Sequence, residues 1–354
     1  AYRQLDAGLR LARAPRRVVQ AYAGPAVVEA YTASYTREGE PEAAIVSALT
    51  PDGDRVLLRV KDPELIGRVL GGDPLGWRIE VTAADAFTVE ETGRAALPPP
   101  GEPPVLVEWH GPVTVLRLNR PRSRNAVDLA TARALEQAID AFEADDAARV
   151  AVLTESGGTF CSGMDLKAAA RGEFPITEGR GPLGLAGKPP TKPLIAAVEG
   201  HALAGGCELA LAADLIVAAE DAEFGIPEAK RGLVAAAGGV LRLAQRLPRG
   251  VAMELALTGD PLPAPRLYEL GLVNRITPPG GALDTALALA RQIAGNAPLS
   301  VDLSKQIVDE HADWPSDEAF DRQSELAGGA LGSEDATEGI RAFAERRDPR
   351  WRGR

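Results

Sequence analysis

Hydrophobic and polar positions alternate along several short runs near the start of the chain. In the run AVVEAYTASYT, the residues Val28, Ala30 and Thr32 alternate with Glu29, Tyr31 and Ala33. This period of two is typical of a β-strand. The turn signal TPDGD separates two further strand-like runs, and a short amphipathic run, DPELIGRVL, indicates one helix before the strand-like WRIEV. Short strands with a single helix predict a small β-rich barrel. The strands are expected at 26–36, 43–49, 54–60 and 77–81, and the helix at 62–70.

The pattern changes after a proline-rich stretch. Five prolines lie between Pro98 and Pro104, where they prevent regular helix or sheet structure and predict a semi-rigid linker. Beyond it, apolar runs typical of buried strands are each followed by a helical or loop segment. The run 128–146 places its apolar residues on one helical stripe. From about Gly238 onward the pattern is almost entirely helical. Buried strands are expected at 113–119, 149–155, 194–200 and 214–220.

This organisation predicts three parts. We expect a small β-rich module at 1–97, a linker at 98–104 and an α/β domain with a helical C-terminal region at 105–354. The basic opening Ala1–Arg17 is interpreted as a solvated helix in preference to a targeting segment, because it lacks serine and a small-residue cleavage signal.

Composition narrows the class of protein. The chain is 45% hydrophobic and 25% charged, which is typical of a globular protein with a substantial core. Its net charge of −11 argues against nucleic acid or an anionic membrane as the main partner. No apolar run approaches the roughly 20 residues of a membrane span. The only two cysteines, Cys161 and Cys207, lie far apart, so we expect no disulfide scaffold and a cytoplasmic location.

Two glutamates are candidates for acid–base chemistry. Glu208 lies among apolar residues in AGGCELALAADLIVA, and Glu228 follows an apolar approach in FGIPEAKRGL. Two such carboxylates suit proton transfer at a neutral carbon centre, although two unrelated surface acids would give the same pattern. Cys207 adjoins Glu208, but no histidine is evident nearby to activate it as a nucleophile.

Glycine-rich turns precede two predicted helix starts. One is AGGCELA, and the other is GGTFCSGMDLKAAA, where a strand ends at Gly157 and Gly158. Backbone N–H groups at a helix start are free and lie at the positive end of the helix dipole. One N–H from each loop could therefore stabilise a developing oxyanion.

Four ordered segments resemble the crotonase, or enoyl-CoA hydratase, superfamily over about 105–354. They are LNRPRSRNAVD, GTFCSGMDL, AAVEGHALAGGCELALAADLIVA and FGIPEAKRGLVAAAGG. The resemblance implies a spiral of ββα units, C-terminal helices that build a homotrimer or hexamer, and an acyl-CoA thioester as substrate. Coenzyme A is part of that substrate, so no separate cofactor and no metal is implied.

The resemblance also assigns roles to individual residues. It implies catalytic glutamates at Glu208 and Glu228, and oxyanion N–H groups at Met164 and Gly205. It implies a loop along the thioester and pantetheine at Met164–Lys167, and a cover over the acyl pocket at 170–193. His201 is a candidate for the acyl pocket or for a core hydrogen bond, while Arg124 and Lys167 are candidates for the coenzyme A phosphates or solvated charges. The substrate-binding set is Arg124, Ala126, Met164, Asp165, Leu166, Lys167, His201 and Gly205.

The first module resembles another family. Residues Ala26–Val89 look like the OB-like domain appended to the C-terminus of some thiolase-like acetyl-CoA acetyltransferases. The resemblance transfers no catalytic residue, but it suggests a thiolase-like or other acyl-CoA enzyme as a partner.

Together these features predict an enoyl-CoA hydratase, a lyase of fatty-acid metabolism of the β-oxidation type. Isomerisation or carbon–carbon cleavage of another acyl-CoA is the alternative within the superfamily. A non-catalytic acyl-CoA-binding scaffold is the alternative outside enzymes, and the presence of both glutamates argues against it.

Overall fold

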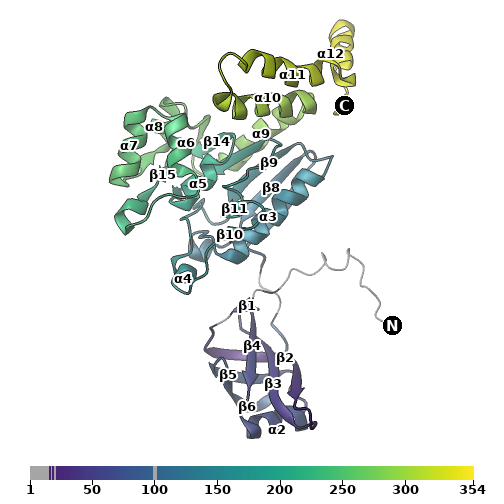
Figure 1. Cartoon of the computed structure of the whole chain (residues 1–354), viewed down its shortest axis with the longest axis vertical. Helices are drawn as coiled ribbons and strands as arrows, with labels where there is room; N and C mark the ends of the chain where they lie inside the picture. Colours follow the sequence, from purple (N-terminus) through teal and green to yellow (C-terminus); the bar gives the residue numbers. More distant parts are fainter. Residues whose placement is uncertain (1–15, 17, 20, 99–101) are drawn as a thin grey trace. The chain divides into compact units, whose positions relative to one another are not determined.

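The computed structural model describes residues 16, 18–19, 21–98 and 102–354. Contacts divide the chain into two compact units, Ala1–Pro103 and Pro104–Arg354 (Figure 1). Nearly all of the basic opening, and Pro99, Pro100 and Gly101 of the proline-rich linker, lie outside the described residues. Among those described, no helix has both the length and the apolar character needed to cross a bilayer.

The first unit is built on a six-stranded sheet in the order β1-β4-β3-β2-β5-β6. Among the described residues of this unit, the one helix is α2 (Pro63–Gly71), which begins at the N-cap Asp62, whose carboxylate accepts the N–H of Leu65. This helix lies in sequence between β4 and β5, so three long strands precede it and two follow, which is the order of an OB-like barrel. The strands are β1 (Val18–Val19), β2 (Gly24–Tyr35), β3 (Pro41–Leu49), β4 (Arg55–Val60), β5 (Trp77–Ala83) and β6 (Ala86–Arg94).

Two details of this unit differ from the expected pattern. The predicted alternation holds only as far as Val28, because a register shift between Val28 and Ala30 changes the direction of the following side chains and leaves Ala30 and Thr32 exposed. Strand β6 was not expected, since its sequence AFTVEETGR is largely polar. It forms because it pairs along β5 at the edge of the sheet.

The second unit contains a six-stranded sheet in the order β17-β14-β12-β9-β8-β7. Within this sheet, β17, β14, β12, β9 and β8 are parallel to one another, and only the edge strand β7 pairs antiparallel. β7 falls just after the proline-rich stretch, where no strand was expected. The strands are β7 (Val105–His110), β8 (Val113–Leu118), β9 (Val150–Glu155), β12 (Leu194–Val198), β14 (Leu215–Ala219) and β17 (Arg275–Thr277).

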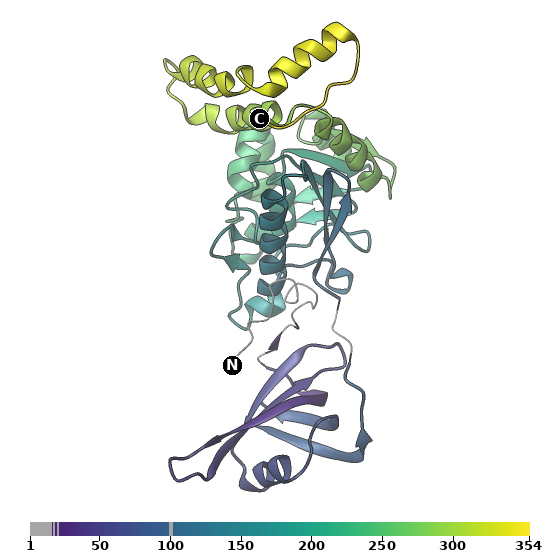
Figure 2. The same cartoon turned by 90° about the vertical axis from the view of Figure 1, so that its right-hand side faces the viewer.

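Helices cover both faces of this sheet (Figures 1 and 2). On one face, α3 (Leu129–Ala144) buries Leu135, Ile139 and Phe142 in the main core. On the other, α9 (Ala282–Ala294) packs on alternate residues of β8, β9, β12 and β14. The central strands are therefore buried on both sides, which explains why they are continuous apolar runs in the sequence.

Smaller elements lie beyond the carboxyl ends of the parallel strands. A one-turn helix α4 (Leu166–Ala169) follows β9, and a hairpin of β10 (Ile176–Thr177) and β11 (Gly181–Pro182) precedes β12. After β12 come β13 (His201–Leu203) and α5 (Gly205–Leu211). β13 pairs with β15 (Glu223–Gly225), which also pairs with β16 (Leu262–Pro263).

The C-terminal part is helical, as expected, apart from the short strands β16 and β17. Figure 2 shows α11 and α12, in yellow, extending beyond the rest of this unit. The remaining helices are α6 (Gly239–Arg246), α7 (Arg249–Thr258), α8 (Ala264–Glu269), α10 (Pro298–Glu310), α11 (Ala319–Leu331) and α12 (Glu334–Glu345).

Candidate active site

The glycine pair before Glu208 allows α5 to enter the core. The residue before the helix, Ala204, has a φ of 52°, a conformation that L residues with a side chain seldom adopt. A side chain at Gly206 would place its Cβ 2.0 Å from the carbonyl oxygen of Cys161. Only glycine permits this approach, so Gly206 seats the helix directly against the chain that leaves β9. All seven helical residues are buried.

Glu208 is a buried acid held by two backbone donors. Its side chain is 3% exposed, and its Oε1 accepts the N–H of Ala237 at 2.7 Å and that of Gly239 at 2.9 Å. A Cβ at Gly239 would lie 2.9 Å from Cγ of Glu208, so that glycine leaves the room that the carboxylate side chain fills. These contacts fix one carboxyl oxygen.

Glu228 comes from the neighbouring 3₁₀ helix η2 (Pro227–Arg231), which follows β15. Its Oε2 is buried, and among the described residues it has no hydrogen-bond partner. A buried polar oxygen without a partner is costly, and such atoms frequently face a ligand or a water molecule. Burial raises the pKa of Glu228.

The two carboxylates interact electrostatically. Burial raises the pKa of Glu208 to about 7, and the negative charge of Glu228 acts in the same direction. The N–H groups of Gly239 and Ala237 and the positive charge of Arg242 oppose this rise. A carboxyl group with a pKa of about 7 can hold a proton near neutral pH, and the negative charge of Glu228 favours that protonated form of Glu208.

The Met164 and Gly205 loops are in contact. A Cβ at Gly163 would lie 2.8 Å from the nitrogen of Gly205 and 2.8 Å from Cβ of Ala204. Gly163 has a φ of +92°, so both its conformation and its neighbours require glycine. In the described part of the chain, neither the N–H of Met164 nor that of Gly205 donates a hydrogen bond. The structure thus brings two free N–H groups together at the start of the helix that carries Glu208.

An internal polar network supports the Met164 loop. The guanidinium of Arg120 binds the carboxylates of Asp128 and Asp165 and the carbonyl oxygen of Ala126. Asp165 also caps α4 by accepting the N–H groups of Lys167 and Ala168. The predicted substrate-binding residue Asp165 therefore has its carboxylate engaged within the protein.

Asn125 anchors the same region from the other side. Its side-chain amide donates to the carbonyl oxygens of Ser156 and Thr159 and accepts the N–H of Arg120. Sequence reasoning did not single out Asn125 or Arg120. Their signal was present in the segment LNRPRSRNAVD, but a polar residue in a loop does not reveal whether its side chain turns inward.

The other predicted substrate-binding residues differ in exposure. Ala126 is buried next to the Arg120 network, whereas Arg124, Leu166 and Lys167 are exposed. His201 is also exposed, on β13, and its Nδ1 lies 3.4 Å from Glu223 on β15. It does not form the core hydrogen bond that was one of its expected roles.

The segment 170–193 is fastened to the core. Arg180 binds Asp140 and Glu143 of α3, and Arg242 of α6 donates to the carbonyl oxygen of Ala186. Leu183, in a strained conformation with a φ of 60°, is buried, and its Cδ1 would be 3.0 Å from a Cβ at Gly205. This segment therefore forms a wall beside one of the two free N–H groups.

Both cysteines are buried in the core. Burial raises the pKa of Cys161 to about 12 and also raises that of Cys207, for which Glu208 and Glu228 add to the shift. A thiol of this kind is a poor nucleophile at neutral pH, so the structure gives no support to a nucleophilic Cys207. Within the described residues, no group of three or more His, Cys, Asp or Glu side chains could hold a metal ion.

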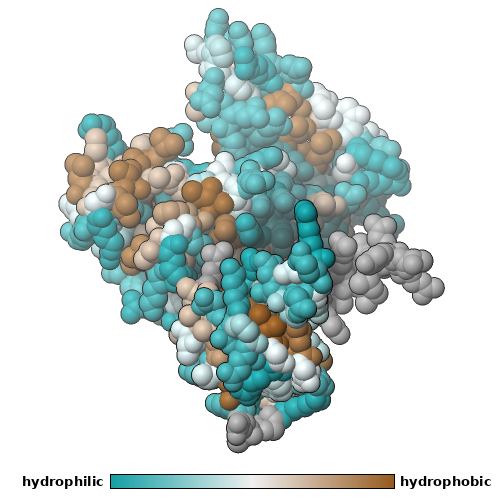
Figure 3. Space-filling view, turned by 60° about the horizontal axis from the view of Figure 1, so that its bottom comes forward, coloured by the Kyte–Doolittle hydropathy of each residue, from teal (hydrophilic) through white to brown (hydrophobic). Residues whose placement is uncertain are grey.

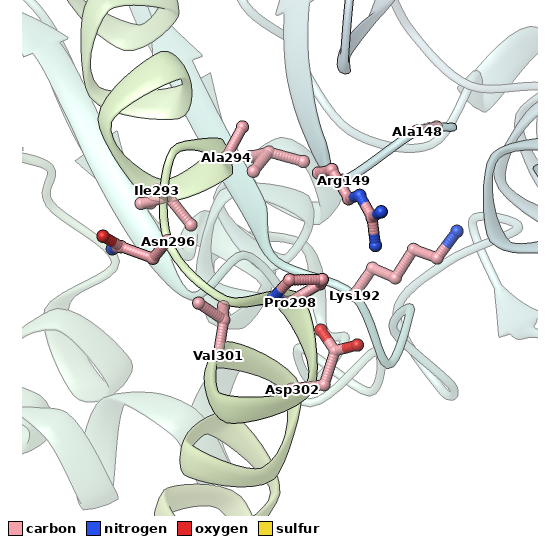
Figure 4. Close-up of a pocket in the computed structure, with 10 residues that line it drawn as sticks. Ala148, Arg149, Lys192, Ile293, Ala294, Asn296, Pro298, Val301 and Asp302 are labelled. Carbon is pink, nitrogen blue, oxygen red and sulfur yellow. The ribbon is translucent and has the colours of Figure 1, made fainter. Parts of the chain in front are cut away.

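A small pocket lies at the amino ends of the parallel strands, opposite the end that carries the glutamates. Figure 4 shows Arg149, Lys192 and Asp302 around it, together with apolar residues of α9 and α10. Its volume is about 20 Å³, enough for one water molecule. Arg149 and Lys192 precede β9 and β12, whereas Met164 and Gly205 follow those strands. This pocket is therefore separate from the glutamate pair.

Comparisons with known proteins agree with this geometry. Residues 108–354 match the family model described as enoyl-CoA hydratase/isomerase, and residues 10–86 match that of the thiolase-like protein type 1 additional C-terminal domain. Both resemblances expected from the sequence are confirmed.

Individual relatives are similar over the second unit. A carnitinyl-CoA dehydratase from Salmonella paratyphi A is 44% identical over 254 residues, which cover 69% of this chain and 97% of that protein. The crystal structure of an enoyl-CoA hydratase from Mycobacterium tuberculosis H37Rv is 57% identical and superposes with a TM-score of 0.70, covering 72% of this chain and 100% of that one. A carnitinyl-CoA hydratase from Mycobacterium avium is 43% identical with a TM-score of 0.57, covering 72% and 100%.

Proposed function

This chain belongs to the enoyl-CoA hydratase/isomerase family, and we propose that it is an enoyl-CoA hydratase, which adds water across the 2,3 double bond of a 2-enoyl-CoA thioester. Its second unit has the crotonase fold, and it is a crotonase-family lyase of the hydratase and dehydratase class. The observation that carries the specific proposal is the presence of two glutamates: Glu208, buried on the helix that begins at Gly205, and the half-buried Glu228, whose charge acts on Glu208 and whose Oε2 is buried without a partner among the described residues.

In the proposed reaction, the N–H groups of Met164 and Gly205 bind the thioester oxygen. Electron density moves onto this oxygen as water attacks C3, and the fixed donors stabilise the enolate-like charge. They are already in position before the reaction, because Gly163 allows their loops to touch. Preorganised donors of this kind lower the barrier without a cost of reorientation.

The glutamates move the protons. One carboxylate takes a proton from the water as its oxygen bonds to C3, and the other delivers a proton to C2, so that one molecule of water is added in total. The reaction needs one carboxylate ionised and one protonated. A pKa of about 7 for Glu208 supports such a state near neutral pH. We assign the acid and base roles to the pair and not to either residue alone.

Other predicted residues would bind the remainder of the substrate. The loop Met164–Lys167 would follow the thioester and pantetheine, with Ala126 beneath it. The exposed cations Arg124 and Lys167 would contact the phosphates of coenzyme A, and His201 would border the acyl group. Segment 170–193 would cover that group.

Two acyl groups are candidates for the substrate. A simple 2-enoyl chain is the first, in agreement with the 57% identical hydratase. The 44% identity to a carnitinyl-CoA dehydratase favours a second, in which the same glutamates remove water from a 3-hydroxyacyl thioester that carries a trimethylammonium group. Both reactions use the same protons and differ in direction and in the acyl pocket.

We also propose that the protein is a cytoplasmic homotrimer or hexamer that serves fatty-acid breakdown of the β-oxidation type. Large apolar side chains are exposed on the C-terminal helices, with Phe320 and Leu331 on α11 and Ile340 and Phe343 on α12. Apolar residues also gather on the left of Figure 3, where Figure 1 places α6–α8. Burial between subunits would remove these side chains from water.

The first unit would bind a partner. Its match to a domain of thiolase-like proteins supports a thiolase-like or other acyl-CoA enzyme as that partner. Such an arrangement would bring the product of one acyl-CoA reaction close to the enzyme that uses it next.

A substrate panel tests the proposed function. Purified protein is mixed with crotonyl-CoA, with longer 2-enoyl-CoA thioesters and, for the reverse direction, with carnitinyl-CoA, and the absorbance of the conjugated thioester is followed. We expect loss of absorbance with at least one enoyl-CoA and formation of the 3-hydroxyacyl product. Double-bond migration or chain cleavage without added water would contradict the proposal.

A further inference from the structure

Arg242 connects three parts of the candidate site. It lies on α6 and is half-buried, and its guanidinium donates to the carbonyl oxygen of Ala237 at 3.2 Å and to that of Ala186 at 2.8 Å. A Cβ at Gly238 would lie 2.4 Å from Nη1 of Arg242. The guanidinium therefore occupies the space that this glycine leaves open.

The first of these carbonyls belongs to a residue that holds Glu208. Ala237 donates its N–H to Oε1 of Glu208 at 2.7 Å, while its own carbonyl oxygen accepts from Arg242. Ala237 is thus held at both ends. A change at Arg242 would free the peptide segment that orients the carboxylate of Glu208.

The second carbonyl belongs to the wall segment. Ala186 lies three residues after Leu183, whose side chain packs against Gly205. One guanidinium therefore fixes both the segment that holds Glu208 and the segment that borders the free N–H of Gly205. The other free N–H group belongs to Met164, and its loop is supported separately by Arg120, which binds the neighbouring Asp165.

The charge of Arg242 also acts on Glu208. The charged groups that influence the Glu208 carboxylate are Glu228, which raises its pKa, and Arg242, which lowers it. Those that influence Arg242 are Glu208 and Asp309 of α10, and the charge of Arg242 in turn adds to burial in lowering the pKa of Arg246 on the same helix. Arg242 is the cation that opposes the effect of burial and of Glu228 on the pKa of Glu208, whereas Arg231 is the cation that lowers the pKa of Glu228.

We propose that Arg242 is a positioning residue for the hydration reaction, which joins the Glu208-binding turn to the wall beside Gly205 and supplies a positive charge near Glu208. The inference rests on the proposed function, because it assigns a task in that reaction. Arg242 touches neither the substrate nor the reacting atoms in this account, so it acts only through the groups that it holds.

The same helix offers a matched control. Arg246 lies one turn after Arg242 and is also half-buried, but its guanidinium donates to the carbonyl oxygens of Leu211 and Ala213 at the end of α5. Both carbonyls lie at the end of α5 away from Gly205, and neither belongs to a residue that donates to the Glu208 carboxylate or to the wall segment. Loss of Arg246 therefore removes a comparable buried arginine without changing the proposed contacts of the site.

Three variants test the inference: Arg242→Gln, Arg242→Lys and Arg246→Gln. We expect kcat of Arg242→Gln to fall roughly 10- to 100-fold, as is usual when a reacting group is slightly misplaced. The loss of the positive charge should also move the alkaline limb of its pH–rate profile to higher pH. Arg242→Lys should lose kcat, because a single ammonium cannot reproduce the geometry of both donations, but its alkaline limb should stay near that of the wild type. Arg246→Gln should keep the kcat of the wild type and the alkaline limb of its pH–rate profile.

A second readout does not depend on turnover. The carboxyl carbon of Glu208 is followed by NMR of protein labelled with ¹³C-glutamate, and its signal is assigned by its absence in Glu208→Gln. We expect the titration midpoint of Glu208 to rise in Arg242→Gln and to be unchanged in Arg246→Gln. If Arg242→Gln does not fold, the Arg242→Lys variant still tests the loss of kcat.

The possible outcomes separate the two proposals. If the wild type hydrates enoyl-CoA but Arg242→Gln keeps both its kcat and the Glu208 midpoint, the inference is wrong and the proposed function stands. Equal effects in Arg242→Gln and Arg246→Gln would also overturn it, because they would indicate a general loss of stability. If the wild type hydrates no substrate, the proposed function fails, and the NMR titration alone decides whether Arg242 sets the charge of Glu208.

Discussion

Glu208 is a charged residue placed where folding alone would favour an apolar one. Two backbone N–H groups donate hydrogen bonds to one of its carboxylate oxygens, yet burial still raises its pKa from 4.5 to about 7. Its half-buried neighbour Glu228 has one buried oxygen that finds no hydrogen-bond partner in the described part of the chain. Buried groups that are costly to stability are common at functional sites, where their altered pKa values suit acid–base chemistry.

The Glu208→Gln substitution should therefore stabilise the folded protein in a pH-dependent way. Because the folded pKa of Glu208 is above the unfolded value, the wild type loses stability as the pH rises from about 4.5 to about 7, and the glutamine variant does not. The difference in unfolding free energy should grow over this range to on the order of a few kcal/mol and stay constant above it. Urea unfolding at pH 5, 6, 7 and 8 measures it.

Glu254→Gln, at an exposed position of α7, is the matched control for this experiment. It shows how much the unfolding free energy changes when one carboxylate is lost at an exposed position. A Glu208→Gln variant that is destabilised equally at every pH would show that the carboxylate contributes only hydrogen bonds.

At this scale the sequence was enough to name the groups that we propose to react, but not the residues that support them. Glu208, Glu228, Met164 and Gly205 could be named because short motifs carry them. Arg120 and Arg242 could not, since an arginine in a loop or an amphipathic helix is normally solvated. Only the folded structure shows that their guanidinium groups bind backbone carbonyls and carboxylates inside the protein.

At the scale of elements, the site depends on close contact between two loops. The loop after β9 and the loop after β13 touch because Gly163 has no side chain, and this contact places the N–H groups of Met164 and Gly205 together. The parallel strands deliver both loops to the same edge of the sheet, which is the usual place for ligands in such folds.

We expect Gly163→Ala to lower the hydration rate by about 10²–10³, the range typical for loss of one oxyanion donor. The added Cβ would lie 2.8 Å from the nitrogen of Gly205 and would force the loops apart. Gly158→Ala is the control, because Gly158 also has a positive φ, of +74°, but nothing within 4 Å of the added Cβ. Steady-state hydration and near-UV circular dichroism of both variants would be compared. Equal losses in the two would show that backbone strain, not loop contact, limits the rate.

The elements that sequence reasoning predicted well are those with a clear pattern. The central strands β12 and β14 are continuous apolar runs and β8 and β9 are largely apolar, because helices cover them on both faces. The edge strands β6 and β7 and the three-residue β17 were not expected. Their sequences are short, polar or close to prolines, and they become strands through pairing with a neighbour.

At the scale of the whole molecule, the chemistry lies in one of two compact units. Every residue that we assign to the reaction belongs to Pro104–Arg354, and each unit has its own hydrophobic core. The apolar and charged content, the proline-rich stretch and the change in pattern were enough to predict a chain in several parts. The oligomer and the partner depend on surfaces, for which the sequence carries no comparable pattern.

A protein that begins at Pro104 should therefore keep the activity. We expect it to fold, to assemble as the full chain does, and to hydrate a short enoyl-CoA within about tenfold of the full-length rate, which corresponds to ~1.4 kcal/mol of barrier. Size-exclusion chromatography and steady-state kinetics of both proteins test this. A truncated protein that assembles correctly but is inactive would mean that the first unit completes the site.

The central claim is that Glu208 and Glu228 act together on one water molecule, and kinetics of the full chain carrying Glu208→Gln or Glu228→Gln test it most directly. The measurement is kcat for hydration of the best enoyl-CoA, together with the Kd for the same thioester. We predict that each substitution lowers kcat by roughly 10²–10⁴ while binding is retained, because a positioned acid or base contributes about that much. If either variant hydrates the substrate at nearly the wild-type rate, the two-carboxylate account is contradicted.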